Sequence, residues 1–341
     1  MQKSRTLLSR TFAVVALSVV IYGAVAVFVG WDDLRERLGR FPAAWLPPLA
    51  GLSLLNYVLR YWRWEIFLRA VDVRLPRRES LGLFFATFVM VITPGKIGEV
   101  FKAGVLRERY GVTLARGLPV VLAERIADFV AVLVIAAVAL VAWPGPLTGL
   151  TSGLLAAAGI PVLVALCQWR PVRERLLARM AASPLLGRRQ LAVDEAAVAL
   201  GTLLGARCGS AALVLSLLAW GAECAGLGIV CRGLDAAVPW LQAAFVYAAG
   251  TLVGSLSFLP GGLGGTEATI IWLLESLDIP REAAGSAALL VRLFTLWLAV
   301  VVGGLVILVS RHLFLGPDAR GPASDEAGPA DGRNGAPGTG G

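Results

Sequence analysis

The chain has 341 residues, of which 57% are hydrophobic and 16% are charged, with a formal net charge of +8 and a mean hydropathy of +0.75. A water-soluble domain cannot bury so much apolar surface, so the composition excludes an ordinary globular protein. The basic residues lie between apolar runs and form no separate basic domain, which favours the anionic membrane surface over nucleic acid as their partner.

Six segments are long and apolar enough to cross a bilayer: about 11–30, 43–62, 117–142, 148–168, 209–231 and 287–310. The first follows Lys3, Arg5 and Arg10, which is how a signal peptide begins. Its apolar run of about 20 residues exceeds the length of a signal core, so we predict a retained first helix.

Two further hydrophobic segments are interrupted. The 80–95 run ends at Thr93-Pro94-Gly95 and continues as an amphipathic stretch over 97–109. The other runs from Trp240 to Pro260-Gly261-Gly262 and resumes from Leu263 to about Leu277. Backbone freed by a break at membrane depth survives only where protein or a watery cavity covers it. Each break is therefore a candidate site lining, and a plain turn at the membrane surface is the alternative.

The distribution of Lys and Arg sets the expected orientation. These residues number three in 1–10, six in 60–79, five in 96–116 and seven in 170–207, against three in 31–40, none in 143–151 and one each in 232–239 and 275–285. The first group is expected in the cytoplasm, so both broken segments become re-entrant hairpins that enter from opposite sides. If Trp240 to Leu259 instead crosses completely, the C-terminus moves outside.

The two breaks match each other. Pro94-Gly95-Lys96-Ile97-Gly98-Glu99 aligns with Pro260-Gly261-Gly262-Leu263-Gly264-Gly265-Thr266-Glu267, and Arg125 follows Pro94 by 31 residues as Arg292 follows Pro260 by 32. Inverted repeats with discontinuous helices are typical of secondary transporters. Glycines permit close backbone approach, and the free amides at a helix start attract an anion such as phosphate.

The predicted fold is therefore all-α and polytopic, with about six full transmembrane helices and two broken hairpins in an inverted repeat. We place one transmembrane domain at 1–312, with repeat 1 at about 43–142 and repeat 2 at about 209–310, followed by a disordered tail at 313–341 that is rich in Gly, Pro, Ala and Asp.

Charged residues within the apolar segments are candidates for function, because burying them is costly unless they pair or meet water. Glu124, Arg125 and Asp128 open a long apolar helix, and an interfacial ion-pair cluster is the alternative for them. Arg292 and Glu267 lie deeper and are placed to pair with each other, or across the repeat with Arg125 and Glu99.

Three other features have two interpretations each. Glu223 is the only charged residue in its apolar segment. We interpret it either as a proton-binding carboxylate or as an interhelical hydrogen-bond partner. Lys96 and Lys102 flank the first hairpin, where they steer an anionic headgroup or anchor to the inner leaflet. We interpret the run Arg60-Tyr61-Trp62-Arg63-Trp64 as an interfacial belt.

Nothing in the sequence implies a cofactor, a metal or a disulfide framework. Cys167, Cys208, Cys224 and Cys231 lie in or beside apolar segments. No nucleotide-binding motif is present, so a gradient or the lipid supply itself would have to drive transport.

The chain resembles the flippase-like membrane region of the lysylphosphatidylglycerol synthase family. The resemblance spans about residues 10–312 and rests on Thr93-Pro94-Gly95-Lys96-Ile97-Gly98-Glu99-Val100-Phe101-Lys102-Ala103, Ala123-Glu124-Arg125-Ile126-Ala127-Asp128 and Leu259-Pro260-Gly261-Gly262-Leu263-Gly264-Gly265-Thr266-Glu267. It implies movement of a lipid between leaflets by a stand-alone member without the soluble synthase domain, and hence no synthase activity.

Our leading hypothesis is a polar cavity between the hairpins that admits the headgroup of a phospholipid or polyprenyl-linked lipid in the cytoplasmic membrane, with both termini in the cytoplasm. The substrate-binding candidates are Pro94, Gly95, Lys96, Gly98, Glu99, Lys102, Glu124, Arg125, Asp128, Pro260, Gly261, Gly262, Gly264, Glu267 and Arg292. The expected partners are membrane lipids and not nucleic acid, and a homo-oligomer is left open. The rivals are an intramembrane transferase acting on a lipid-linked donor, a transporter of small anionic solutes and a membrane subunit with an assembly role.

Overall fold

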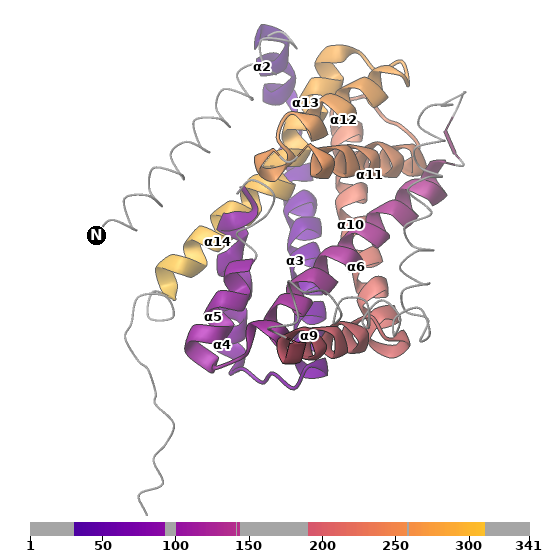
Figure 1. Ribbon diagram of the computed structural model, residues 1–341. Coiled ribbons are helices and arrows are strands. Elements are labelled where there is room, and N and C mark those ends of the chain that lie inside the picture. The colour runs from indigo at the N-terminus through magenta and orange to yellow at the C-terminus, as the bar shows by residue number, and fades with distance from the viewer. Residues whose placement is uncertain (1–30, 93–99, 141, 144–189, 258, 311–341) are drawn as a thin grey trace, which may run out of the picture.

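The computed structural model describes residues 31–92, 100–140, 142–143, 190–257 and 259–310. Every regular element in these ranges is a helix (Figure 1). The predicted crossings at 11–30 and 148–168, the motif residues 93–99 and the tail at 313–341 lie outside the described residues.

The first described half contains α2 (Trp31–Arg40), η1 (Ala43–Trp45), α3 (Leu46–Ala70), α4 (Arg77–Ala86), η2 (Thr87–Ile92), α5 (Val100–Tyr110) and α6 (Leu114–Leu140). The second contains α9 (Gln190–Leu203), α10 (Ala206–Gly233), α11 (Trp240–Leu256), η5 (Pro260–Gly262), α12 (Gly265–Glu275), α13 (Arg281–Arg292), η6 (Leu293–Trp297) and α14 (Leu298–Val309). The helix predicted at 43–62 in fact continues to Ala70, two turns further.

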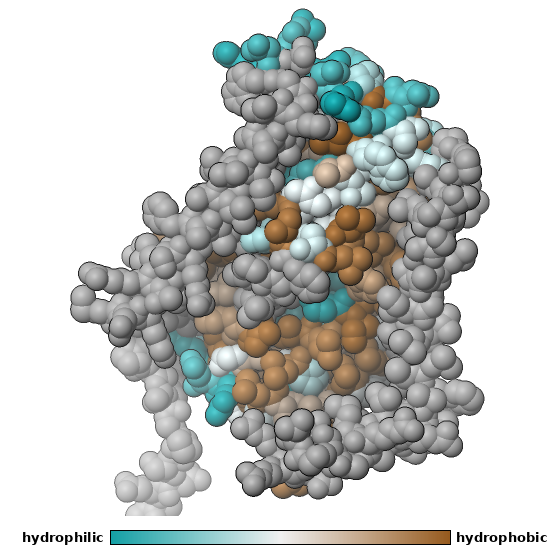
Figure 2. Space-filling view, turned by 45° about the horizontal axis from the view of Figure 1, so that its top comes forward, coloured by the Kyte–Doolittle hydropathy of each residue, from teal (hydrophilic) through white to brown (hydrophobic). Residues whose placement is uncertain are grey.

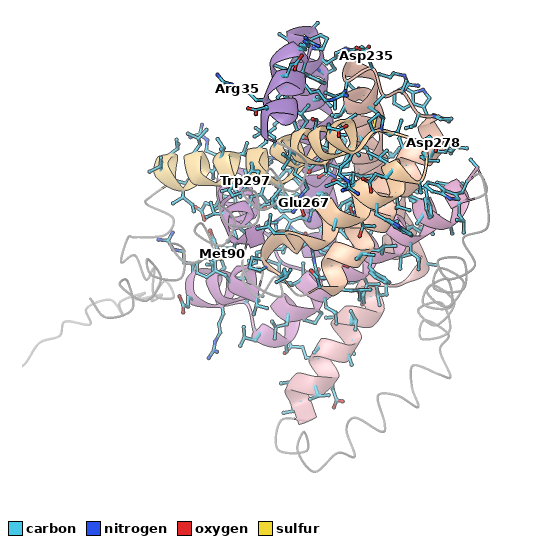
Figure 3. The ribbon with its side chains drawn as sticks, turned by 90° about the horizontal axis from the view of Figure 1, so that it is seen from above. Arg35, Met90, Asp235, Glu267, Asp278 and Trp297 are labelled. Atoms are coloured by element: carbon cyan, nitrogen blue, oxygen red, sulfur yellow. The ribbon has the colours of Figure 1, made fainter. Side chains whose placement is uncertain are left out.

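Three interhelical turns are built alike. An aspartate with positive φ ends the helix, and the next residue donates its amide to a carbonyl five residues back, at Asp72, Asp235 and Asp278. This is the Schellman motif, in which Asp occupies the left-handed position usually taken by Gly. A proline then precedes the next helix at Pro76, Pro239 and Pro280. Seen from above, Asp235 and Asp278 lie towards the edge of the molecule, whereas Glu267 lies near its middle (Figure 3).

Helices α3 and α10 form the central pair and run antiparallel. Asn56 Nδ2 donates to the Ala219 carbonyl at 2.9 Å, and further along α3 Arg63 Nη1 donates to Ser216 Oγ at 2.5 Å. The partner number falls as the α3 number rises, so the two chains run in opposite directions. In Figure 1, α4 and α5 lie at one end of this pair, and α11 to α13 lie towards the other end.

The last helix of each half packs against the broken segment of the other half. Helix α6 contacts α11, while α14 contacts α4 and η2, and η2 itself contacts η5. Helices α11 and α12 form a hairpin, since a methyl group added at Gly250 would meet Ile270 and one added at Gly254 would meet Thr266. The segment after Trp240 therefore turns back at η5, as the break at Pro260 predicts.

Many large apolar side chains are exposed on the described helices, and several charged side chains are buried. Exposed side chains include Leu54, Val58, Leu218, Val301 and Leu305, whereas Arg63, Glu124, Asp128 and Glu267 are buried. Two described helical stretches are long and apolar enough to cross a membrane, Ala206–Gly233 and Arg281–Val309, and Trp240–Leu256 is a shorter apolar helix. Helices α3 and α6 have 25 and 27 residues, which is long enough to cross a membrane, but they contain several charged residues. This arrangement suits a hydrocarbon surround.

Candidate functional site

A cavity of about 460 Å³ lies between the two halves of the described chain. Its wall comes from α3, η2, α6, α10, α11, the η5 turn, α12, α13, η6 and α14. Polar side chains from both halves line it, including Arg60, Arg125, Asp128, Glu223 and Arg292, alongside apolar ones such as Leu252 and Leu259. Figure 2 shows a recessed, mainly apolar face of the molecule with a few polar groups at its centre.

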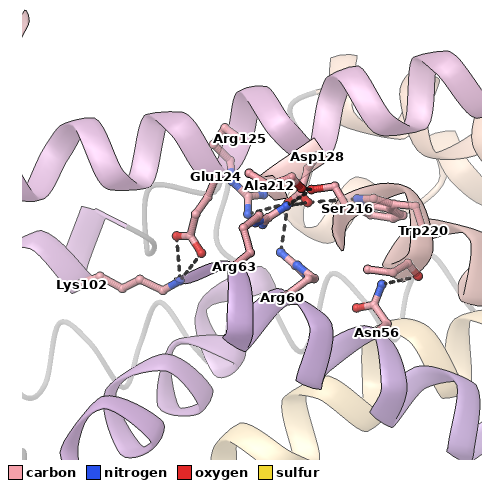
Figure 4. A network of polar contacts seen from close by, with 11 residues as sticks. Asn56, Arg60, Arg63, Lys102, Glu124, Arg125, Asp128, Ala212, Ser216 and Trp220 are labelled. Atoms are coloured by element: carbon pink, nitrogen blue, oxygen red, sulfur yellow. Dashed lines mark hydrogen bonds and ion pairs between the residues drawn. The ribbon is translucent and has the colours of Figure 1, made fainter. Parts of the chain in front are cut away.

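Asp128 is the centre of a cationic cluster on one wall of the cavity (Figure 4). Its carboxylate accepts from Arg63 at 2.5 Å, Arg125 at 3.0 Å and Arg60 at 3.2 Å, and from Trp220 Nε1 at 3.0 Å. Among the described residues, three guanidinium groups share this one carboxylate, and Arg60 and Arg63 alone outnumber it. The cluster therefore concentrates positive charge in a buried site.

The interfacial-belt interpretation of residues 60–64 is wrong. Arg63 and Trp64 are both 0% exposed, and only Trp62 of the two tryptophans reaches the surface. The reason is the length of α3: because the helix continues to Ala70, Arg60 and Arg63 lie within it and not at its end. The sequence signal for this was the turn at Asp72 and Pro76, which marks the true end of the helix.

Lys102 is 3% exposed, so the interpretation as an anchor to the inner leaflet is wrong, whereas the steering of an anionic headgroup stays a prediction. Its Nζ lies 3.1 Å from Glu124 Oε2 and 4.5 Å from the centroid of the Phe84 ring. A buried ammonium needs such a carboxylate and gains from the aromatic face. Glu124 is thus paired with Lys102, and the predicted charge cluster on α6 divides into two sites.

Arg292 and Glu267 pair with each other, which is the first of the two arrangements that the sequence predicts. Arg292 Nε donates to Glu267 Oε1 at 2.8 Å, and Arg292 Nη2 donates to the Gly261 carbonyl at 2.5 Å. Glu267 is 0% exposed and Arg292 is 7% exposed. Arg292 therefore ties the η5 turn to α13 while it also lines the cavity.

The η5 turn depends on glycine. Gly261, Gly262 and Gly264 have φ values of 61°, 69° and 82°, a region that other residues seldom adopt. The Gly264 amide donates to Glu267 Oε2 at 2.7 Å, which is one half of a capping box. The protein's own carboxylate thus occupies the start of α12. The glycine pattern had suggested that this amide would bind a phosphate, but it is already engaged by Glu267.

A π-helical turn follows Arg292 at once, over Leu293–Trp297. Insertions of this kind free backbone carbonyls and often mark functional positions. The Tyr57 hydroxyl from α3 donates to the carbonyls of Phe294 and Thr295 at 3.3 and 3.4 Å. An aromatic residue of the first half thereby stabilises the irregular backbone of the second.

Glu223 lies in the middle of α10 and is 4% exposed. Tyr247 on α11 donates to its Oε2 at 3.2 Å. No ion pair joins Glu223 to a cation within the part of the chain that the structure describes. It is a lining residue of the cavity, as are Tyr57, Trp220 and Tyr247, which the sequence analysis missed.

The structure brings together several of the residues that the sequence singled out. Arg125, Asp128, Gly261, Gly262, Glu223 and Arg292 line one cavity, and Glu267 adjoins it through Arg292. Pro260 lies in the same turn and Gly264 precedes α12. Lys102 and Glu124 form their own buried pair. Pro94, Gly95, Lys96, Gly98 and Glu99 lie outside the described residues.

The arrangement favours anion binding over metal binding. No group of three or more His, Cys, Asp or Glu side chains is close enough to hold a metal in the regions described above. The cavity lining includes the guanidinium groups of Arg60, Arg125 and Arg292, which suit the oxygens of a phosphate or carboxylate.

Comparison with known proteins gives consistent matches. The chain is 33% identical over 92 residues to a UPF0104 membrane protein from Methanothermobacter thermautotrophicus, covering 27% of this chain and 28% of that protein. It is 28% identical over 106 residues to a UPF0104 membrane protein from Pyrococcus horikoshii, covering 31% and 32%. The matched stretches thus span about a third of these relatives. The model of the lysylphosphatidylglycerol synthase TM region matches residues 14–303, and the chain therefore belongs to that family of membrane proteins.

Proposed function

We propose that the protein moves a phosphate-bearing lipid between the leaflets of the cytoplasmic membrane. The observation that carries this proposal is the sharing of the Asp128 carboxylate by the guanidinium groups of Arg60 and Arg63 beside a central cavity, among the described residues. Buried charge without enough counter-charge is unfavourable, and an anionic ligand would offset it. The Arg60 Nε is buried and has no hydrogen-bond partner in the described ranges, which leaves a donor for that ligand.

The size and lining of the cavity favour a headgroup over a whole lipid. About 460 Å³ is within the range of small-molecule sites and suits a polar headgroup. Val91, Leu252, Leu259 and Leu296 line it along with the arginines, and Leu259 is 42% exposed. An apolar wall that reaches the surface lets acyl or prenyl chains stay in the bilayer while the headgroup enters.

A repeated organisation of the lining supports transport. Tyr57 and Trp220 are 163 residues apart in the sequence, as are Arg60 and Glu223. Arg125 and Arg292 are 167 apart, and the same separation relates Asp128 to Thr295, Phe129 to Leu296 and Val132 to Ala299. All twelve residues line the cavity. We infer an inverted repeat whose axis passes near the Asn56–Ala219 contact.

This repeat suggests how the cavity changes leaflets. The first helices of the repeats are antiparallel, and each last helix packs on the other repeat's broken segment. Rocking of one half against the other would then open the cavity to either side, as in other inverted-repeat transporters. In this proposal the two broken segments are re-entrant hairpins, the full count is six crossings, and the charge distribution places both termini in the cytoplasm.

The test is leaflet exchange in liposomes. Purified protein is reconstituted with traces of labelled phosphatidylglycerol, an aminoacyl phospholipid or a short-chain polyprenyl phosphate, and exchange is followed by chemical quenching of the outer leaflet. Arg60→Gln should slow exchange of the transported lipid about tenfold, the effect of one charge-assisted hydrogen bond. Arg116→Gln is the matched control, because Arg116 lies on α6 in an exposed pair with Glu195.

Other outcomes decide between this proposal and its rivals. No exchange of any lipid by folded wild-type protein would overturn it. Uptake of inorganic phosphate in the same vesicles, lost in Arg60→Gln, would indicate a transporter of small anionic solutes. Consumption of the polyprenyl-linked probe would indicate a transferase.

A further inference from the structure

Two carboxylates line the cavity in very different surroundings. Asp128 accepts from three guanidinium groups and from the Trp220 indole. Glu223 accepts from one hydroxyl, that of Tyr247 at 3.2 Å, and takes part in no ion pair with a described residue. Among the described residues, Arg60 and Arg63 place two positive charges against the one negative charge of Asp128, while the buried carboxyl of Glu223 lines the same cavity without an ion pair.

The charged and titratable groups that face Glu223 come from every element around it. They are Tyr57 and Arg60 on α3, Arg125 and Asp128 on α6, Tyr247 on α11 and Arg292 at the end of α13. Arg292 is engaged with Glu267 and Gly261. Arg60 is held at 3.2 Å by Asp128, which has other donors, so Arg60 is the cation best able to change partner.

The sequence positions of Arg60 and Glu223 strengthen this pairing. They are 163 residues apart, the separation that also relates Asn56 to Ala219 across the α3–α10 contact. Arg60 also lies against the indole of Trp220, with its Cζ 6.0 Å from the ring centroid, and Trp220 is three residues before Glu223 on α10. The fold thus places a cation of α3 next to the turn of α10 that carries a carboxyl, and both groups line the same cavity.

We propose that Glu223 binds and releases the proton that is coupled to lipid transport. The step needs no other reactant: a carboxylate oxygen takes up H⁺ from water on one side of the membrane and returns it on the other. This inference rests on the proposed function, because the coupled ligand is the anionic headgroup.

The sign of the coupling follows from the charges. With a proton on Glu223, Arg60 stays with Asp128 and the cavity keeps its excess of positive charge, which favours the anionic headgroup. When the proton leaves, the carboxylate attracts Arg60 and competes with the headgroup for it. Proton and lipid therefore bind together, and by linkage each tightens the binding of the other.

The experiment imposes a pH gradient across proteoliposomes containing labelled phosphatidylglycerol. For the wild type, reversing the gradient should change the initial exchange rate several-fold. For Glu223→Gln, the ratio of the rates under the two gradients should be close to one. Glu195→Gln, a change at an exposed carboxylate, should respond like the wild type. A wild-type response in Glu223→Gln, or a response to a sodium gradient in place of the pH gradient, would overturn the proposal.

A second readout does not depend on transport. Infrared difference spectra of the detergent-solubilised wild type between acid and alkaline pH should contain a protonated-carboxyl band that shifts in D₂O and is absent from Glu223→Gln. Should that variant not fold, Tyr247→Phe removes the hydroxyl partner and should shift the same band. An unchanged band in both variants would overturn the proton site. A band assigned to Glu223 without any lipid exchange would overturn the proposed function alone.

Discussion

The two arginines at matching positions in the chain, Arg125 and Arg292, lie in unlike electrostatic settings. Arg292 donates to the Glu267 carboxylate and to the Gly261 carbonyl, so it clamps the η5 turn to α13. Arg125 shares Asp128 with Arg60 and Arg63. The second half of the protein thus uses an arginine to fix its hairpin, and the first half gathers arginines around one acid.

This difference separates structural charge from charge that is ready for a ligand. A balanced buried pair is satisfied within the protein, and breaking it mainly costs stability. A cluster with more cations than anions is satisfied only in part, and a bound anion would improve it. The predictions below test this division, and they run from the largest expected effect to the smallest.

Removing the shared acid should have the largest effect. Asp128→Asn leaves Arg63, which is fully buried, with no carboxylate among its described neighbours. Breaking a buried ion pair from one side costs about 3–5 kcal/mol, and with three cations affected we expect a loss near the upper end. The free energy of unfolding in detergent micelles measures it. Asp32→Asn, at an exposed site, is the control, and an equal melting temperature in both variants would contradict the cluster.

Breaking the Arg292–Glu267 clamp should have the next largest effect on stability. Arg292→Met should lower the free energy of unfolding by about 3 kcal/mol, because it removes the guanidinium group that pairs with the buried Glu267 carboxylate. The double variant Arg292→Met, Glu267→Gln should lose less than the sum of the two single changes, since it removes both charges of one pair. Additive losses would show that the two side chains act independently.

The first broken segment depends on close packing of η2 against α14, whereas the second has the Arg292–Glu267 clamp. A methyl group at Gly303 would come within 2.7 Å of the Val89 amide nitrogen and 3.0 Å of the Phe85 carbonyl oxygen, whereas Gly304 has nothing within 4 Å. Gly303→Ala should therefore cost about 2 kcal/mol through displacement of η2 from α14. Gly304→Ala, one residue away on the same helix, should be neutral. Equal thermal stability of the two variants would contradict this packing.

The second hairpin was the part of the fold that the sequence predicted best. Pro260 and the glycines that follow it require a break, and a buried arginine 32 residues later needs a buried acid, so the Arg292–Glu267 pair could be anticipated. The gathering of Arg125, Asp128, Glu223 and Arg292 around one cavity follows from the same reasoning, since apolar segments leave few other partners for their charges.

The cationic cluster was missed for a physical reason. A helix that crosses a bilayer needs about 20 residues. The predicted helix therefore ends with its apolar run at residue 62, and this places Arg60 and Arg63 at the membrane interface. Helix α3 is longer than the membrane requires and has 25 residues, which draws both arginines inward. Pairing of Lys102 with Glu124 was missed because it depends on how α5 folds back on α6, which sequence spacing does not reveal.

Arg60→Gln should have the smallest effect on stability and a clear effect on ligand binding, and this contrast tests the division most sharply. Arg60 is partly exposed. When Arg60 is replaced, the Asp128 carboxylate still accepts from Arg63, Arg125 and Trp220. The free energy of unfolding should fall by less than about 1 kcal/mol, while the affinity for the transported lipid falls about tenfold. Thermal unfolding with and without added lipid separates the two, because a bound ligand raises the melting temperature of the wild type. A variant that loses stability but keeps the full lipid-induced shift would place Arg60 with the structural arginines.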